Sequence, residues 1–154
     1  MKLNKILLSA AVATFAVTLL SCDRNGGDIG PYFGIWALDG IDADGNPDLA
    51  FVPDHTFFSF HSNVVEVTLT DEYHQYISRF GTWSEPAPAT LRLDFSHHDD
   101  LTDPGTGWYA PPEWIHITSP VTDLHIDRLT SSRMELTYTA PAAVYTFRLR
   151  KVNR

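Results

Sequence analysis

Residues 144–151, Val-Tyr-Thr-Phe-Arg-Leu-Arg-Lys, have the pattern of a half-buried β-strand. The large apolar residues Tyr145, Phe147 and Leu149 occupy every second position, and polar residues stand between them. Successive side chains of a strand point to opposite faces of its sheet. The segment therefore predicts a strand with one face toward a hydrophobic core and the other toward water.

The same period-two pattern recurs along most of the chain, with turn-forming residues between the runs. The predicted strands cover residues 33–38, 56–61, 64–70, 74–83, 90–95, 124–129, 134–139 and 144–151, with shorter ones around 49–52 and 114–117. Antiparallel strands with one apolar face must close on themselves or pair as two sheets. The Cys pair of an immunoglobulin-type sandwich is absent, so we predict an all-β, antiparallel, up-and-down barrel of eight strands.

Length and charge limit the classes of protein to which the chain can belong. Its 154 residues suit one domain, and its formal net charge is −8. An acidic surface repels phosphates, so nucleic acid is not an expected partner. The single Cys excludes a disulfide framework and a multi-cysteine zinc site. The hydrophobic core must therefore hold the barrel together.

The start of the chain has the pattern of a bacterial export signal. Lys2 and Lys5 precede an uncharged, apolar run over residues 6–20. This run is shorter than the roughly 20 residues of a membrane-spanning helix, and it has the length of a signal-peptide core. It ends in Leu19-Leu20-Ser21-Cys22, which resembles the bacterial lipobox, and Cys22 is the only cysteine.

The lipobox resemblance implies a lipoprotein. Residues 1–21 would be a removed signal peptide, residues 22–30 a flexible tether beginning at the lipidated Cys22, and residues 31–154 the barrel. Removal of the signal peptide leaves 9 basic and 19 acidic residues, so the lipid alone should contact the membrane. We expect a protein of the cell envelope, at the outer membrane, with the periplasmic and surface faces both left open.

The first predicted strand carries Gly34-Ile35-Trp36, which resembles the G-x-W motif on the first strand of lipocalins. In that family the Trp plugs the closed end of the barrel, and an Arg from the last strand packs across its ring. The resemblance therefore implies that Gly34 and Trp36 close the barrel together with Arg148 or Arg150. A cation over an indole face contributes roughly 0.5–2 kcal/mol.

The chain is also similar to small lipocalin-like lipoproteins of gut-type Gram-negative anaerobes, a family of unknown function. Phe80-Gly81-Thr82-Trp83, the strand at 91–95, the stretch 124–138 and the closing 145–151 carry this likeness. Two lipocalin features are missing. Leu124 stands where the T-D-Y motif has its Tyr, and no long helix precedes the last strand. These departures put a conventional ligand-carrying cup in doubt and leave the barrel intact.

The long connection over residues 96–113 holds the most unusual side chains. Trp108 and Tyr109 are costly to expose in a loop, so they either cover the barrel mouth, stack on a sugar, or fold back with Trp114 to cap the core. We predict that Trp83, Trp108, Tyr109 and Trp114 bind the ligand, and that the last three of these line the entrance.

Two acidic segments contain metal-ligand types. His97-His98-Asp99-Asp100 would need a loop conformation to bring both imidazoles to one ion, and a solvated turn is the favoured interpretation. The run from Asp42 to Asp48 has oxygen ligands at alternate positions. The positions of the EF-hand Gly and Glu hold Pro47 and Pro53, which favours a hairpin turn. We predict no metal site.

No nucleophile, metalloprotease or nucleotide-binding motif is present, so we expect neither an enzyme nor a cofactor. The favoured function is binding of a small apolar or amphiphilic ligand at the barrel mouth. The alternative is a non-enzymatic accessory lipoprotein with a filled barrel, which would bind a glycan or another envelope protein. An exposed aromatic patch without a cavity would favour this alternative.

Overall fold

The computed structural model describes residues 30–71, 73, 75–97 and 107–152. The predicted signal peptide, Cys22 and residues 98–106 of the 96–113 connection lie outside these residues. The described strands are β1 (Gly34–Ala43), β2 (Asn46–Pro47), β3 (Thr56–His61), β4 (Val64–Thr70), β5 (Tyr76–Ala87), β6 (Thr90–Asp94), β7 (Val121–Leu129), β8 (Arg133–Thr139) and β9 (Val144–Lys151). Three short 3₁₀ helices are η1 (Gly30–Tyr32), η2 (Gly107–Tyr109) and η3 (Glu113–Ile115).

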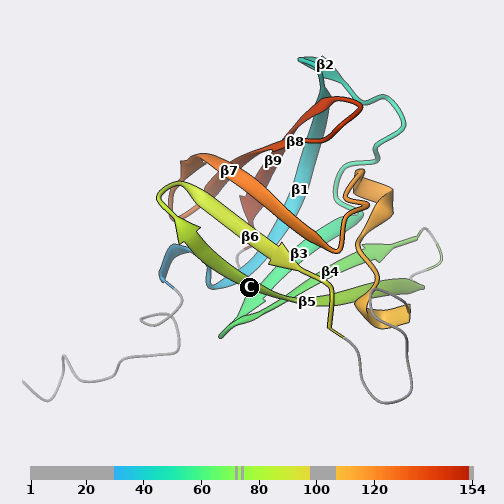
Figure 1. Cartoon of the computed structure of the whole chain (residues 1–154). Helices are drawn as coiled ribbons and strands as arrows, with labels where there is room; N and C mark the ends of the chain where they lie inside the picture. Colours follow the sequence, from blue (N-terminus) through green and yellow to red (C-terminus); the bar gives the residue numbers. More distant parts are fainter. Residues whose placement is uncertain (1–29, 72, 74, 98–106, 153–154) are drawn as a thin grey trace, which may run out of the picture.

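Eight of the strands form a closed antiparallel barrel (Figure 1), which confirms the predicted fold. From β3 to β9 each strand pairs with the next one in the chain, and β1 pairs with both β3 and β9. The β1–β9 register runs from Trp36 opposite Lys151 to Ala43 opposite Tyr145. Because β1 has a partner on each side, the barrel has no unpaired strand edge at this point.

The ends of several strands differ from the prediction, for local reasons. β1 extends to Ala43 and turns through Asp44 and Gly45, which both have positive φ angles, into the two-residue β2. This is the hairpin predicted for the acidic run. β5 continues past Pro86, which sits in a register shift where its missing N–H costs no ladder hydrogen bond.

The prediction of short strands around residues 49–52 and 114–117 was wrong. The first segment is a loop, in which the Asp48 carboxylate accepts a hydrogen bond from the backbone of Ala50. The second follows two prolines that cannot donate to a strand ladder, and it forms η3. His116, with φ +65°, ends this turn.

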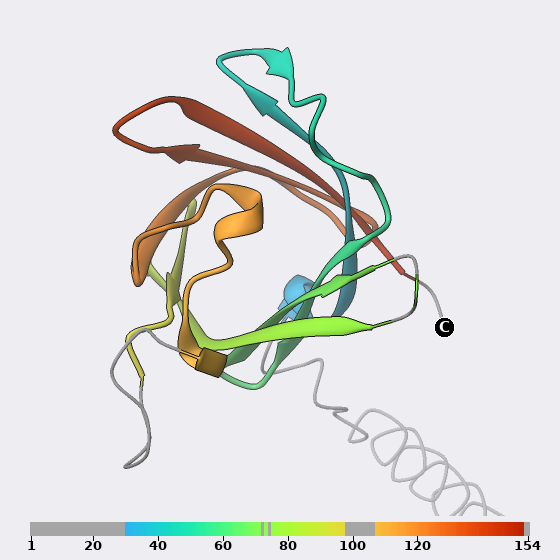
Figure 2. The same ribbon diagram turned by 90° about the vertical axis from the view of Figure 1, so that its right-hand side faces the viewer.

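One continuous hydrophobic cluster fills the barrel interior. It extends from Tyr32 and Trp36 at one end to Ile115 and Ile117, which come from the segment that contains η3. Figure 2 looks onto this second end, where the orange segment lies across the ring of strands. We call this second end of the barrel the mouth. Both isoleucines are fully buried, so side chains fill the barrel up to the mouth. Among the described residues, no helix is long and apolar enough to cross a membrane.

Candidate functional site

The end of the barrel opposite the mouth is closed around Trp36, the residue to which the lipocalin resemblance assigns this place. The Trp36 indole is fully buried, and its Nε1 donates a hydrogen bond to Tyr32 O at 2.8 Å. Lys151 Nζ lies 5.1 Å from the ring centroid and donates to Pro31 O at 3.2 Å. Burial lowers the pKa of Lys151, whereas the indole face and the carbonyl favour its charged form.

The cation over Trp36 is therefore Lys151, and the expectation of Arg148 or Arg150 was wrong. Strand alternation is the reason, since Lys151 shares the inward parity of Phe147 and Leu149. The two arginines point outward instead. Arg148 pairs with Asp42, and Arg150 pairs with Asp39, at 2.9 Å, and with Asp54.

Gly34 belongs to the closed end as well. Its φ is +116°, a conformation that L side chains rarely adopt. A Cβ atom built on Gly34 would lie 3.1 Å from Lys151 Cε. Glycine therefore lets the lysine stem pass close to the backbone on its way to Trp36.

Trp83 also lies at the closed end, away from the mouth. Its ring centroid is 4.8 Å from that of Tyr32 and 5.6 Å from that of Phe60. The Tyr32 hydroxyl donates to Glu85 Oε1 at 2.6 Å, and burial and this bond raise the pKa of Tyr32. The structure thus places Trp83 among the aromatic side chains of the closed end, apart from the predicted ligand-binding residues Trp108 and Trp114.

The mouth contains an open cleft of about 670 Å³. The loop before β3, the adjoining ends of β3 and β4, and Trp114 of η3 form its walls. The lining is mostly apolar with a few polar groups, and comprises Ala50, Phe51, Val52, His55, Thr56, Leu69, Thr70, Asp71 and Trp114. His55 Nδ1 donates to Thr70 O at 2.8 Å, which fixes the imidazole against the cleft wall.

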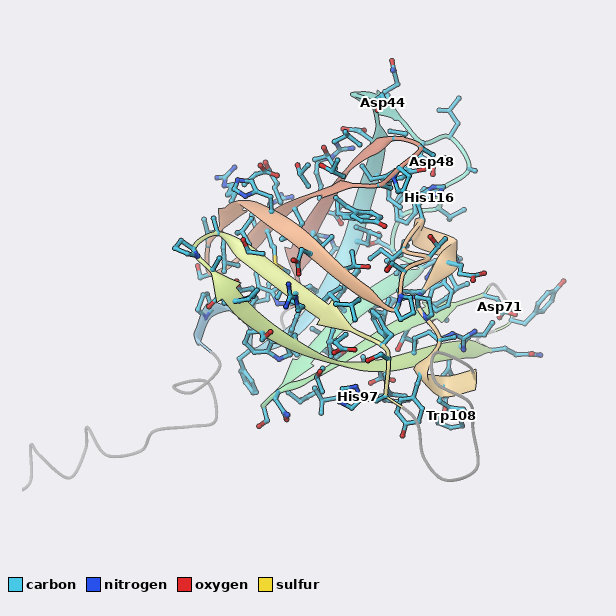
Figure 3. All side chains as sticks on the ribbon, in the orientation of Figure 1. Asp44, Asp48, Asp71, His97, Trp108 and His116 are labelled. Carbon is cyan, nitrogen blue, oxygen red and sulfur yellow. The ribbon has the colours of Figure 1, made fainter. Side chains whose placement is uncertain are left out.

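A hydrogen-bonded pair attaches the mouth-capping segment to the loop after β2. His116 Nε2 lies 2.8 Å from Asp48 Oδ2, and the His116 ring stacks on Tyr145 with centroids 4.5 Å apart. Figure 3 shows Asp48 and His116 together beside the mouth. The bond from His116 is the largest cause that holds the pKa of Asp48 below its usual value.

Trp108 lies elsewhere, on the outer face of β5. Its ring stacks on Phe80 at 5.8 Å and 14° and remains 69% exposed. These two aromatic residues border a second cleft of about 380 Å³, whose other lining residues are Glu66, Tyr76, Ile77, Ser78 and Arg79. Glu66 Oε1 accepts hydrogen bonds there from Ser78 Oγ at 2.7 Å and Thr68 Oγ1 at 3.2 Å.

Comparisons with solved structures agree on the architecture. A lipocalin-like protein from Bacteroides uniformis ATCC 8492 superimposes with a TM-score of 0.56 at 18% identity, covering 80% of this chain and 100% of its own. An uncharacterized protein from Bacteroides eggerthii DSM 20697 gives a TM-score of 0.58 at 16% identity, covering 79% and 99% respectively. This chain has the lipocalin-like fold. No family model and no curated protein matches the chain.

The lipocalin-like barrel separates the four residues predicted to bind ligand. Trp114 lines the mouth cleft, Trp108 lines the outer cleft, and Trp83 belongs to the closed end. Tyr109 is half-buried in η2 and lines neither of these clefts. Of the metal candidates, His97 lies within the described residues and His98 to Asp100 do not. Within the part of the chain that the structure describes, no group of three metal-ligating side chains occurs.

Three residues of the lipocalin-like mouth were not predicted. Ile115 and Ile117 cap the core, although their spacing in the sequence indicated a strand. Arg79 borders the outer cleft, and its guanidinium carbon lies 5.6 Å from the ring centroid of Trp114, which is a wall of the mouth cleft. Its position could have been deduced, because Arg79 has the same strand parity as Gly81 and Trp83, which both face inward.

Proposed function

We propose that the protein is a membrane-anchored, lipocalin-like lipoprotein that binds a small apolar or amphiphilic ligand in the mouth cleft. The single observation that carries this proposal is the cleft itself. Its volume of about 670 Å³ falls within the roughly 300–1,000 Å³ of small-molecule sites. Its apolar walls are interrupted by a few polar groups, which is the usual composition of such sites.

The filled interior supports a shallow binding mode. Ile115 and Ile117 occupy the space below the mouth, so a ligand would lie against Trp114 instead of deep among the strands. The ligand would be small, with an apolar part against Phe51, Val52 and Leu69. This mode needs neither an open cup nor the long helix that the sequence lacks.

The anchoring half of the proposal depends on Cys22 and the lipobox. The first described element, η1, begins at Gly30, the last residue of the predicted tether, so a lipid on Cys22 would hold the barrel within a short distance of the membrane. A ligand released from the bilayer would then need little diffusion to reach the cleft.

Native mass spectrometry tests the binding proposal. A chain beginning at Asp23 retains every described strand and the whole core. After incubation with a lipid and small-molecule extract of the source organism, this chain should carry a reproducible mass adduct. The adduct should be lost in Trp114→Ala and retained in Trp108→Ala. A bare mass across the whole extract would contradict the proposal.

A second candidate function, glycan binding, is supported by the outer cleft. Trp108 and Tyr76 are 69% and 73% exposed there, and Glu66, Thr68 and Ser78 form a hydrogen-bonded polar floor. Exposed rings and a carboxylate can stack on and hydrogen-bond to a sugar. On this candidate, Trp108→Ala would abolish retention on an immobilised polysaccharide without unfolding the barrel, and unchanged retention would contradict it.

A further inference from the structure

Arg79 is directed into the barrel, although it lies on a strand with polar residues on its outer face. It is paired in register with Val67, which is fully buried, and its neighbours Ser78 and Phe80 are paired with the outward Thr68 and Glu66. Side chains of directly paired residues share a face of the sheet. Leu69, the next inward residue of β4, lines the mouth cleft.

Arg79 also differs from the other arginines in its partners. Each of the remaining five in the described residues forms an ion pair: Arg92 with Asp123, Arg128 with Glu135, Arg133 with Asp39, Arg148 with Asp42, and Arg150 with Asp39 and Asp54. Arg79 has no such carboxylate among those residues. Its hydrogen bond there is a long one, from Nη1 to Ser78 O at 3.4 Å.

Two unpaired donors meet at this place. Arg79 Nε and Trp114 Nε1 are both buried, and neither has a hydrogen-bond partner among the residues that the structure describes. The guanidinium lies over the Trp114 ring, so the two donors belong to one local arrangement. A buried donor without an acceptor is costly, and most such donors in proteins are paired. Trp114 is a wall of the mouth cleft, so these two donors indicate a ligand group that accepts their hydrogen bonds there.

We propose that Arg79 and Trp114 bind the carboxylate of an amphiphilic ligand whose apolar part lies in the mouth cleft. This inference rests on the proposed function, because Trp114 is a wall of that cleft. A planar guanidinium matches a carboxylate better than it matches a hydroxyl, and a partly buried setting strengthens the bond. The acidic surface would repel anions elsewhere on the molecule, so this unpaired cation also supplies selectivity.

Titration calorimetry with three probes tests the proposal on the chain beginning at Asp23. Decanoate carries both the apolar tail and the carboxylate of the proposed ligand. Decanol carries the tail without the carboxylate, and acetate carries the carboxylate without the tail. Decanoate should bind about ten- to a hundredfold more tightly than decanol, since a hydrogen bond to a charged group is worth roughly that factor. Acetate should bind weakly or not at all.

Substitutions assign the difference to the two donors. Arg79→Met should lower the affinity for decanoate to that for decanol and leave decanol binding unchanged. Arg92→Met, which removes an outer-face arginine, is the matched control and should change neither the affinity for decanoate nor that for decanol. Trp114→Phe keeps a ring under the guanidinium and removes Nε1–H, so it should weaken decanoate severalfold. If Arg79→Met does not fold, the result for Trp114→Phe decides whether this arrangement binds the carboxylate.

The outcomes separate the two claims. Equal binding of decanoate and decanol would overturn the role of Arg79 and Trp114 and leave the mouth cleft as a binding site. An unchanged affinity for decanoate in Arg79→Met would also overturn the role of the two donors. If Arg79→Met does not fold, an unchanged affinity in Trp114→Phe would have the same meaning. Failure of both decanoate and decanol to bind would overturn the proposed function for this class of ligand and the inference with it.

Discussion

His116 Nε2 and Asp48 Oδ2 lie 2.8 Å apart and join the segment that caps the barrel mouth to the loop after β2. The pair connects residues 68 positions apart in the chain. Below it, Ile115 and Ile117 complete the core, and beside it Trp114 forms a wall of the cleft. The position of this cleft wall therefore depends on a polar contact at the rim as well as on burial.

Asp48→Asn should lower the free energy of unfolding by about 1 kcal/mol at neutral pH, the typical worth of such a bond. The pKa of Asp48 is lowered in the folded state, so its contribution is present above the unfolded pKa of about 3.9 and is lost as the pH falls through the folded value. Urea unfolding should show the two proteins converging in acid. Glu113→Gln, an exposed change on the same segment, should have little effect, and a pH-independent difference would contradict the account.

Lys151→Met should destabilise the barrel by roughly 0.5–2 kcal/mol, because it keeps most of the stem but removes the charge over Trp36. Arg128→Met removes an exposed ion pair and is expected to cost about 0–1 kcal/mol. Thermal unfolding monitored by circular dichroism measures both. The closed-end assignment would be wrong if the lysine variant were as stable as the native protein.

Gly34→Ala should destabilise the fold by about 1–3 kcal/mol, since the new Cβ would occupy a strained φ of +116° and crowd Lys151. Gly107 also has a positive φ, but a Cβ there meets open space. The same substitution at Gly107 should therefore cost less. Denaturant midpoints compare the two variants, and equal midpoints would argue against the crowding.

Trp108→Ala should change stability by less than about 1 kcal/mol and leave mouth binding intact, because the ring is mostly exposed on the outer face. Trp114→Ala should abolish mouth binding. Fluorescence competition with decanoate and an environment-sensitive dye distinguishes the two. Loss of mouth binding in Trp108→Ala would place the site in the wrong cleft.

Cys22→Ala should prevent lipidation and leave the protein unanchored, because a thiol is the only group in the chain that can carry a thioether-linked lipid. Metabolic labelling with an alkyne fatty acid and fractionation of membranes measure both effects. Label retained by the Cys22→Ala variant would contradict the lipoprotein assignment.

The sequence predicted most of the barrel, because strand alternation is a local property that each segment displays by itself. Strands β3, β4 and β9 have the predicted ends. The mouth was harder to predict. Residues 114–117 include three apolar side chains that suit a strand, but two prolines precede them, and Ile115 and Ile117 pack into the open end of the barrel instead.

The assignment of aromatic residues to the two ends could not be made from composition alone. Trp83 and Trp114 are both partly buried, yet they lie at opposite ends, because Trp83 of β5 packs on Tyr32 and Trp114 of η3 lies at the mouth. The parity of β9 did carry usable information. It puts Lys151 on the inner face and Arg148 and Arg150 on the outer face, which the family resemblance alone did not indicate.

The four tryptophans allow the central claim, binding at the mouth against Trp114, to be tested in one spectrum. Their indole N–H groups report on the closed end (Trp36 and Trp83), the outer cleft (Trp108) and the mouth (Trp114). In a ¹H–¹⁵N correlation spectrum assigned with single Trp→Phe variants, added decanoate should shift the Trp114 signal strongly and leave the other three nearly unmoved. A shift confined to Trp108, or no shift at all, would contradict binding at the mouth.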